Sequence, residues 1–455
     1  MTVAEERKAN QEKFIYAADI PTFDVTKPLP PTVLPSLKWQ YNFKCSVYGI
    51  GLVRPIITAP NLKSGGTELN AVPYLIPNLT RLRPDKFSDE FFVERRLNGF
   101  SPGKLKRVEN KPWQYFIRYD FSDVTVDANG ILPRFIEARF CLDGQQLQVH
   151  SIEFILHGER EVKNLTPRDQ DWEWAKKLFR CAEFVLHETV AHLGGTHLNI
   201  DQYAMAYYRN VVNSPIIELL EPHFEGLLSI NQQGLAELVG TEGNEGVVPQ
   251  LTVLNIQDTQ RILVAELKTL TYRNWSSRKS TLPDYVANNH YDRAAIAMWK
   301  IINKYVKDFF DQNQAGIQEY WSEIAAMSKD LTAHSILKPE LGILDIKTLQ
   351  DLREMCVYVI YISTFQHSWV NHKQYDDGGD IEYATLGMWK EKDPMTAAKN
   401  ARQLTTTLNL TSVRHNPIMG VNLPVANKLK EALWEIRDQI QPGIAIDTIL
   451  MSISI

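Results

Sequence analysis

Three histidines recur at five-residue intervals within one largely apolar stretch of the chain, at His187, His192 and His197. In a regular α-helix five residues turn through about 500°, which leaves such neighbours about 140° apart. A π-type turn, closing between residues i and i+5, returns two of these imidazoles to one face. Residues 171–197 carry apolar side chains at helical spacing. The spacing therefore predicts a buried helix that contains a π-type turn.

A second pair of polar side chains, His367 and Asn371, lies four residues apart, on one face of a regular helix. The preceding residues 355–362 are apolar on every side, which predicts burial. Buried imidazoles need polar partners, and a metal ion satisfies several at once. From spacing alone two interpretations stay open: a transition-metal site shared by two helices, or core histidines that are hydrogen-bonded separately.

The segment from His187 to His192 has a superficial likeness to the zinc-binding helix of metalloproteases. That motif, His-Glu-x-x-His, places its histidines four residues apart. Here three residues separate Glu188 from His192. The spacing disfavours a zinc hydrolase.

Composition narrows the class of protein further. A formal net charge of -5 over 455 residues gives no basic surface for nucleic acid. The N-terminus lacks the apolar run of a secretory signal, and no stretch reaches the roughly 18 to 20 apolar residues of a spanning helix. The four cysteines are widely spaced, as expected for reduced thiols: Cys45, Cys141, Cys181 and Cys356. We expect a cytoplasmic protein, with peripheral membrane contact as an option.

The amino-acid composition and the pattern of apolar residues change along the chain. Residues 1–85 are proline-rich, which predicts irregular structure and short helices. Ser88 is a candidate N-cap for a helix over 89–97. The remaining predictions are strands at 113–119, 136–142 and 147–156, the last two joined by a hairpin at Asp143-Gly144, and helices at 171–197, 296–328, 348–366 and 422–440. The fold class predicted is mainly α with a small β-sheet in the first third.

Several segments together resemble the lipoxygenase family. They are Trp172, Ala175-Lys176 and Glu183-Phe184 leading into His187-Glu188-x-x-x-His192-x-x-x-Thr196-His197, then His367-x-x-x-Asn371, and the ending Ser452 to Ile455. Weaker likeness extends the match to residues 89–102 and 213–223. The resemblance implies one catalytic domain over 1–455, a helical bundle around a long central helix, with a lead-in at 1–85, a core at 86–455 and no amino-terminal PLAT β-barrel.

The resemblance also implies a cofactor and a reaction. One non-haem iron, cycling between Fe2+ and Fe3+, would be bound by His192, His197, His367, Asn371 and the carboxylate of Ile455, while His187 is not a ligand. This requires residues 451–455 to enter the core, which their apolar character permits. No side chain would be catalytic beyond the iron-bound hydroxide. The expected activity is insertion of O2 into linoleate- or linolenate-like polyunsaturated fatty acids to give hydroperoxides. The alternative is a fatty-acid-binding protein of the same fold without turnover.

Pocket residues are assigned by the same resemblance. Phe184, Glu188 and Gln374 would border the substrate, although ordinary core or solvated roles remain open for them. Gly234, followed by Leu238, occupies the position where the family has glycine in R-specific and alanine in S-specific enzymes. A register shifted by two residues would place Ala236 there instead. We favour Gly234 and an R product.

Departures from the family pattern are Ser214, where histidine is common, and Asp201, where glutamate is usual. Neither position is an iron ligand in the family.

The expected partners are a polyunsaturated fatty acid, O2 and an enzyme that metabolises the hydroperoxide. Membrane lipid could meet exposed aromatic and apolar side chains of the first third, with two arginines near a fatty-acid carboxylate. The candidates are Phe14, Ile15, Tyr16, Phe91 and Phe92, with Arg95 and Arg96.

Overall fold

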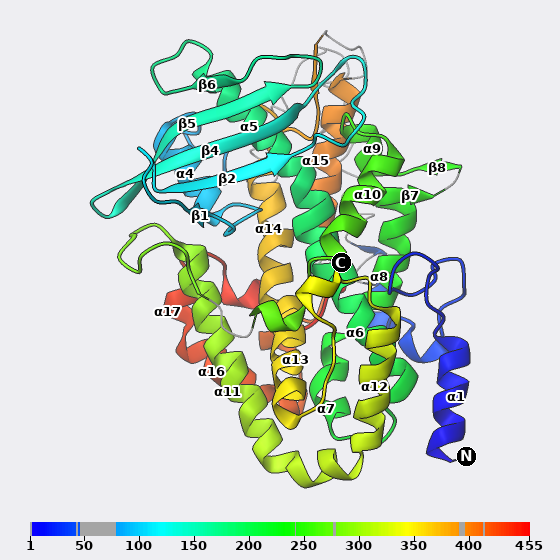
Figure 1. Ribbon diagram of the computed structural model, residues 1–455. Coiled ribbons are helices and arrows are strands. Elements are labelled where there is room, and N and C mark those ends of the chain that lie inside the picture. The colour runs from blue at the N-terminus through cyan, green and yellow to red at the C-terminus, as the bar shows by residue number, and fades with distance from the viewer. Residues whose placement is uncertain are drawn as a thin grey trace.

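The computed structural model describes residues 2–41, 44–45, 79–241, 243–275, 279–390, 396–412 and 415–455. A twisted sheet lies at one end of a larger helical body, and long helices run from beneath the sheet to the opposite end (Figure 1). The predicted lead-in at 1–85 falls partly outside the described residues. Its described part contains the helix α1 (Val3–Lys13) and the short helix η1 (Pro31–Val33).

The sheet is antiparallel, with strand order β1-β2-β4-β5-β6. Its inner side chains, such as Ile136, Phe140 and Phe154, are fully buried and share a core with the first half of the central helix. The predicted hairpin is confirmed, and Gly144 at its turn adopts φ +57°. The bounds are β1 (Lys106–Arg107), β2 (Tyr115–Asp120), β4 (Pro133–Asp143), β5 (Gln146–Leu156) and β6 (Lys163–Leu165), with two small pairs β3 (Gly130–Ile131) with β9 (Met388–Trp389) and β7 (Gly240–Thr241) with β8 (Asn244–Glu245).

The helix predicted after Ser88 is α4 (Asp89–Asn98). The Ser88 hydroxyl accepts a hydrogen bond from the amide of Phe91, 3.1 Å away. This satisfies one of the amides that a helix start leaves unpaired.

A continuous helix runs through the middle of the molecule as α5 (Trp172–Leu186), η2 (His187–Leu198) and α6 (Asn199–Asn210). The junction residues keep right-handed helical dihedrals, so the axis is not broken. The segment η2 is π-helical over 12 residues. The predicted π-type turn is confirmed, and it coincides with the three histidines.

A second long helix packs against the first and comprises α13 (Leu349–Tyr361), η7 (Ile362–Gln366) and α14 (His367–Gly378). The sequence predicted helix over 348–366 and placed His367 and Asn371 on one face of a regular helix, and the structure continues this helix to Gly378. The segment η7 is again π-helical, immediately before His367.

Two predicted helices are each divided in the structure. The stretch 296–328 forms α11 (His290–Glu319) and α12 (Trp321–His334), which separate at Tyr320. Periodicity missed the break because buried side chains continue on both sides of it, as Ile317 and Ile324 show. The stretch 422–440 likewise forms η9 (Pro424–Ala426), α16 (Asn427–Glu435) and α17 (Arg437–Ile440). The other helices are α7 (Ile216–Leu220), η3 (Glu221–His223), α8 (Leu227–Gly234), η4 (Leu235–Val239), α9 (Val247–Leu251), α10 (Ile256–Leu267), η5 (Tyr272–Trp275), η6 (Pro339–Leu341), α15 (Thr396–Ser412), η8 (Ile418–Gly420) and η10 (Ile446–Thr448).

The proposed lipid-contacting aromatics are mostly interior. Phe14, Phe91 and Phe92 are at most 2% exposed. The prediction that they meet lipid is therefore wrong, because their rings fill the core. Of that set, Ile15 is the clearest surface residue, at 38% exposed.

The two arginines assigned to a fatty-acid carboxylate have carboxylate partners of their own. Arg95 Nε lies 2.6 Å from Asp377 Oδ1 in a buried ion pair, and Arg96 pairs with Glu183. That assignment is wrong as well, because both guanidiniums are already neutralised inside the fold. Within the described ranges, helices that combine the length and apolarity needed to cross a membrane are absent.

The last five residues, Met451 to Ile455, are all buried. The amide of Leu450 donates to the Ser368 hydroxyl at 2.8 Å, and the carbonyl of Met451 lies 2.7 Å from His223 Nδ1. Figure 1 shows the C-terminus within the helical body. The prediction that the chain end enters the core is confirmed.

Candidate metal centre

The two long helices bring three imidazoles to one point. Potential ligand nitrogens of His192, His197 and His367 all lie within 4.8 Å of one another, and all three residues are buried. Ring centroids are 5.0 Å apart for His192 and His197, and 4.9 Å apart for His197 and His367. The structure thus brings together histidines from both predicted helices.

The π-helical backbone explains how His192 and His197 share a site. Their five-residue spacing matches the i to i+5 closure of this helix. The threonine hydroxyls of Thr189 and Thr196 donate to the carbonyls of Val185 and His192, at 2.9 and 2.6 Å. These bonds offer the carbonyls a partner in addition to the irregular helix ladder.

The orientation of His197 is fixed by a neighbouring amide. Asn231 on α8 accepts at Oδ1 from Nδ1 of His197, 2.9 Å away, which leaves Nε2 for the cluster. The Asn231 side-chain amide donates to Asp201 at 2.8 Å, and Asp201 accepts from the backbone amide of Phe23 at 3.0 Å. A hydrogen-bonded chain therefore links the lead-in to a candidate ligand, as is usual for metal-binding histidines.

The three imidazoles are held neutral, the state in which histidine binds metals. Burial lowers the pKa of His192 to about 4 and the pKa of His197 to about 3. Burial first, and the electrostatic influence of the neighbouring His197 and His192 second, also lower the pKa of His367 well below its ordinary value. Within the part of the chain that the structure describes, His192 Nε2 and both ring nitrogens of His367 are buried without hydrogen-bond partners. A metal ion would satisfy them, so the residues fit one.

Asn371 lies one turn after His367 on α14 and is fully buried. Its amide nitrogen donates to the carbonyl of Leu410 at 3.0 Å, and its Oδ1 accepts from Nε2 of Gln374 at 3.0 Å. The side chain is therefore held from both ends, and the oxygen retains a lone pair for a further partner.

Ile455 lines the same cavity as His192 and His197. Its backbone is also close enough to His367 to raise the pKa of that imidazole, against the larger effect of burial. The chain terminus thus lies beside all three histidines.

His187 occupies a different environment from the other histidines of η2. Its ring packs against Phe100, with centroids 4.8 Å apart, and against Phe184 at 6.0 Å. Its Nε2 is 4.0 Å from Oε1 of Glu188. Burial raises the pKa of Glu188 to about 8. His187, Glu188 and His192 could themselves group around a metal, yet of the two groups only the cluster of His192, His197 and His367 offers three imidazole nitrogens.

A narrow apolar cavity borders the histidine cluster. Of the residues assigned to the substrate pocket, Glu188, Gly234 and Leu238 line it, whereas Phe184, Gln374 and Ala236 do not. Phe184 is packed in the core against Phe100. A Cβ built on Gly234 would meet only Leu238 Cδ1, at 4.0 Å, so the glycine borders open space.

Other residues of this cavity were missed by sequence reasoning: Thr189, Leu193, Ile230, Val239, Val248, Thr259 and Leu410. Thr189 and Leu193 could have been found, because they lie next to Glu188 and His192 on the same helix. Val248, Thr259 and Leu410 come from three other helices and carry no local signal.

Comparison with known proteins decides the family. A sequence model of the lipoxygenase family matches residues 159–409, which include His192, His197, His367 and Asn371. The chain belongs to the lipoxygenase family. Lipoxygenases are known as non-haem iron proteins, and this member has a buried histidine cluster suited to a metal.

Two curated relatives are similar over half of the chain or more. The linolenate 9R-lipoxygenase of Nostoc sp. is 28% identical over 98% of this chain and 57% of its own length. The human hydroperoxide isomerase ALOXE3 is 28% identical over 53% of this chain and 35% of its own length. The chain therefore spans just over half the length of the first curated relative and about a third of the second.

Solved lipoxygenase structures share the fold. The crystal structure of a 9R-lipoxygenase from Cyanothece PCC8801 matches with a TM-score of 0.85 and 25% identity, over 97% of this chain and 76% of that one. The mainly helical fold with its small sheet and π-helical central helix is thus the lipoxygenase catalytic fold.

Proposed function

We propose that this chain is an iron-dependent dioxygenase that inserts O2 into polyunsaturated fatty acids such as linoleate or linolenate. The observation that carries the proposal is the convergence of His192, His197 and His367 beside a buried chain terminus and an apolar cavity. A mixed nitrogen and oxygen ligand set suits non-haem iron. The family membership and the similarity to 9R-lipoxygenases support it.

The proposed ligands are His192, His197, His367, the Oδ1 of Asn371 and the carboxylate of Ile455. When bound there, iron would act as a one-electron acceptor, so that a hydrogen atom leaves a bis-allylic methylene of the fatty acid. O2 would add to the carbon chain, and return of the hydrogen atom would give a hydroperoxide. His187 is not a ligand in this proposal, since its ring packs between Phe100 and Phe184.

The chain's own residues position the substrate and exclude water. Ile230, Leu238 and Val248 offer apolar walls to an acyl chain next to the histidines. The cavity volume is about 40 Å³, far less than a fatty acid occupies. Substrate entry therefore requires some of these side chains to move. Burial of the site keeps a radical away from solvent.

We further propose an R-configured product. Gly234 and Leu238 line the cavity together, whereas Ala236 does not, which supports the register that places glycine at the stereochemical position. We also propose that residues 1–455 act as one catalytic domain. The lead-in residue Phe23 bonds to Asp201, which is linked to His197 through Asn231, and the terminal Ile455 lines the histidine cavity.

The decisive experiment combines activity with metal content. Purified protein is incubated with linoleate and O2, conjugated-diene absorbance is followed, and bound iron is measured. Diene formation proportional to iron content is expected, with loss after chelation and recovery on adding iron. Iron-loaded protein that forms no diene from any common polyunsaturated acid would contradict the proposal and favour a fatty-acid-binding role.

One relative is named a hydroperoxide isomerase, so the assay should also contain preformed fatty-acid hydroperoxide. Consumption of hydroperoxide without diene formation from linoleate would assign an isomerase activity in place of dioxygenation.

A further inference from the structure

A small cavity lies where α4, α5 and the end of α14 meet, and it shares no lining residue with the histidine cavity. Its volume is about 10 Å³, roughly the space that one water-sized group requires. Every residue that lines it is buried. The lining carries three guanidiniums and two carboxylates: Arg95, Arg96, Arg180, Glu183 and Asp377.

Both carboxylates of this cavity are already paired with an arginine. Arg95 donates from Nε and Nη2 to the two oxygens of Asp377, at 2.6 and 3.1 Å. Arg96 on the same helix pairs with Glu183. The lining therefore holds one cation more than it holds anions, and Arg180 carries the surplus charge.

The guanidinium of Arg180 is fixed by Tyr383. Its Cζ lies 4.1 Å from the centroid of the Tyr383 ring, and its Nε donates to the Tyr383 carbonyl at 2.9 Å. These contacts hold the side chain without supplying a negative charge. Asp380 and Glu382, which precede Tyr383 in the chain, are engaged by the Lys86 ammonium at 2.8 and 2.9 Å. Arg180 thus remains the surplus cation.

Three polar atoms of the lining can donate hydrogen bonds that the protein does not receive. Within the described part of the chain, Arg180 Nη1, Arg96 Nε and the Tyr383 hydroxyl are buried without a hydrogen-bond partner. Guanidinium nitrogens can only donate, and a tyrosine hydroxyl can donate as well. A buried charge is costly unless it is paired and hydrogen-bonded. An acceptor that carries a negative charge would meet both needs at once.

We propose that this cavity binds a small monovalent anion of halide size, which accepts hydrogen bonds from Arg180 and Tyr383 and balances the surplus charge. The volume excludes larger anions such as phosphate. A water molecule would fit, but it brings no charge and adds two hydrogens to a cationic lining. The ion would join α4, α5 and the segment after α14. The inference is independent of the metal site and of the proposed reaction.

Crystals of the iron-loaded protein grown in sodium bromide test the position of the ion directly. We expect an anomalous bromide peak within hydrogen-bond distance of Arg180 Nη1 and the Tyr383 hydroxyl. A peak in this cavity without anomalous signal would identify water and overturn the proposal.

Thermal unfolding of the iron-loaded protein tests whether the ion binds in solution. Chloride replaces gluconate at constant ionic strength, because gluconate is too large for the cavity. A ligand that binds only the folded state raises the unfolding midpoint with its concentration, so a saturable rise with chloride is expected. An unchanged midpoint would overturn the proposal, and a bromide peak in the crystal would then be an adventitious ion only.

Variants of the two donors connect this effect to the cavity. Tyr383→Phe removes one hydroxyl and no charge, and should raise the half-saturating chloride concentration about tenfold, as expected for loss of a hydrogen bond to an ion. Arg180→Gln should abolish the chloride effect, and Arg180→Lys should retain part of it because the charge stays. If Arg180→Gln does not fold, Tyr383→Phe still decides, since unchanged chloride dependence in that variant would overturn the proposal.

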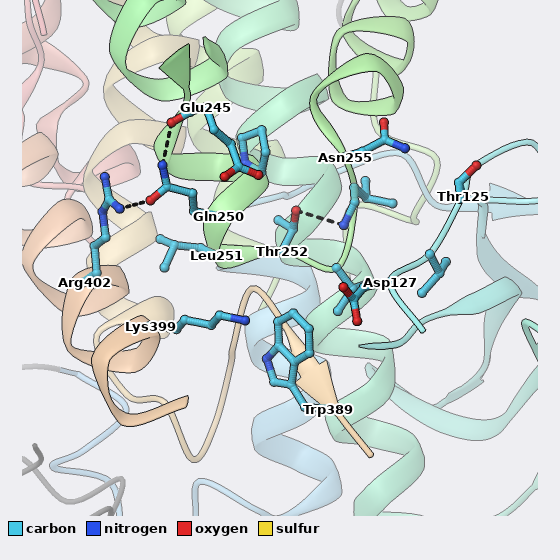
Figure 2. Close-up of a pocket in the computed structure, with 14 residues that line it drawn as sticks. Thr125, Asp127, Glu245, Gln250, Leu251, Thr252, Asn255, Trp389, Lys399 and Arg402 are labelled. Atoms are coloured by element: carbon cyan, nitrogen blue, oxygen red, sulfur yellow. Dashed lines mark hydrogen bonds between the residues drawn. The ribbon is translucent and has the colours of Figure 1, made fainter. Parts of the chain in front are cut away.

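Arg402→Gln is the matched control for loss of one positive charge. Arg402 is half-buried on α15, and its guanidinium donates to Oε1 of Gln250 in a wider groove, as Figure 2 shows. Thr125 and Asp127 on the lining of that groove are exposed, so solvent reaches it. The variant should keep the chloride dependence of the wild type. Equal loss of the chloride effect in Arg402→Gln and Arg180→Gln would indicate a general effect of net charge and overturn the proposal.

Discussion

The indole Nε1–H of Trp39 donates a hydrogen bond to the carbonyl of Ser454, 2.7 Å away and 415 residues along the chain. Both residues are buried, and the bond holds the terminal segment next to the histidine cluster. The lead-in therefore takes part in placing the chain end.

Replacing Trp39 by phenylalanine should loosen the terminal segment. The Ser454 carbonyl would lose its donor, at a cost of about 1 to 3 kcal/mol. We expect a lower unfolding temperature and faster loss of iron to a chelator. Trp434→Phe is the control, because Trp434 is 54% exposed and should change stability by less than about 0.5 kcal/mol. Equal iron retention in both variants would count against the role of Trp39.

Deleting Ile455 should remove one proposed ligand. We expect iron content and diene formation to fall at least about tenfold, with far-UV circular dichroism preserved, because the ladder bonds of the long helices do not involve this residue. Appending two glycines should have the same effect by displacing the carboxylate. Ile455→Val keeps the carboxylate and should retain iron. Full iron content in the deletion variant would exclude the terminal carboxylate as a ligand.

Asn231→Ala should weaken metal binding through His197. The variant removes the acceptor for His197 Nδ1 and the donor to Asp201. Loss of such an orienting bond typically lowers metal affinity about 10- to 100-fold, which iron titration would measure. Gln233→Ala, on the same helix but bonded to Glu237, should leave iron affinity unchanged.

Asp201 should make the unfolding free energy depend on pH. Burial raises the pKa of Asp201 to about 7, partly opposed by hydrogen bonds from Asn231 and Phe23. Between about pH 4 and pH 7 the folded protein therefore holds a proton that the unfolded chain releases. The contribution of this residue to stability must fall as pH rises, by up to about 1.4 kcal/mol per pH unit.

The effect of Asp201 is isolated by comparing wild type with Asp201→Asn. Both proteins are metal-free, and the free energy of unfolding is measured with urea at several pH values. The stability of wild type relative to the variant should decline from pH 4 to pH 7. A difference that is constant across this range would show that Asp201 ionises normally.

Gly234→Ala should change product stereochemistry from R towards S. The added methyl group would enter the cavity with Leu238 Cδ1 as its nearest neighbour at 4.0 Å, so folding should be unharmed. Chiral chromatography of the reduced product measures the change. Ala236→Gly is the matched control and should leave the R product unaltered, because Ala236 does not line the cavity.

Local sequence patterns determined much of the fold. The hairpin over β4 and β5, the Ser88 cap and the π-helical segment around His192 all depend on interactions between residues near one another in the chain. The alternation of apolar and polar residues, the capping residue and the five-residue spacing of the histidines are all visible in the sequence. The hairpin, the cap and the π-helical segment could therefore be predicted.

The membrane-contact prediction failed for the opposite reason. Phe91 and Arg95 look like a lipid-facing aromatic and a free cation in the sequence, yet Phe91 is 1% exposed and Arg95 pairs with Asp377, 282 residues away. Side-chain type alone does not reveal a distant partner.

The family motif in the sequence is sufficient to indicate the candidate ligands, from His192 to Ile455. Only the tertiary structure could bring histidines of two helices together and place the chain end on the same cavity. Only it could show that Trp39 bonds to Ser454. These contacts join residues that are far apart in the chain. They form only when the apolar interior packs as a whole.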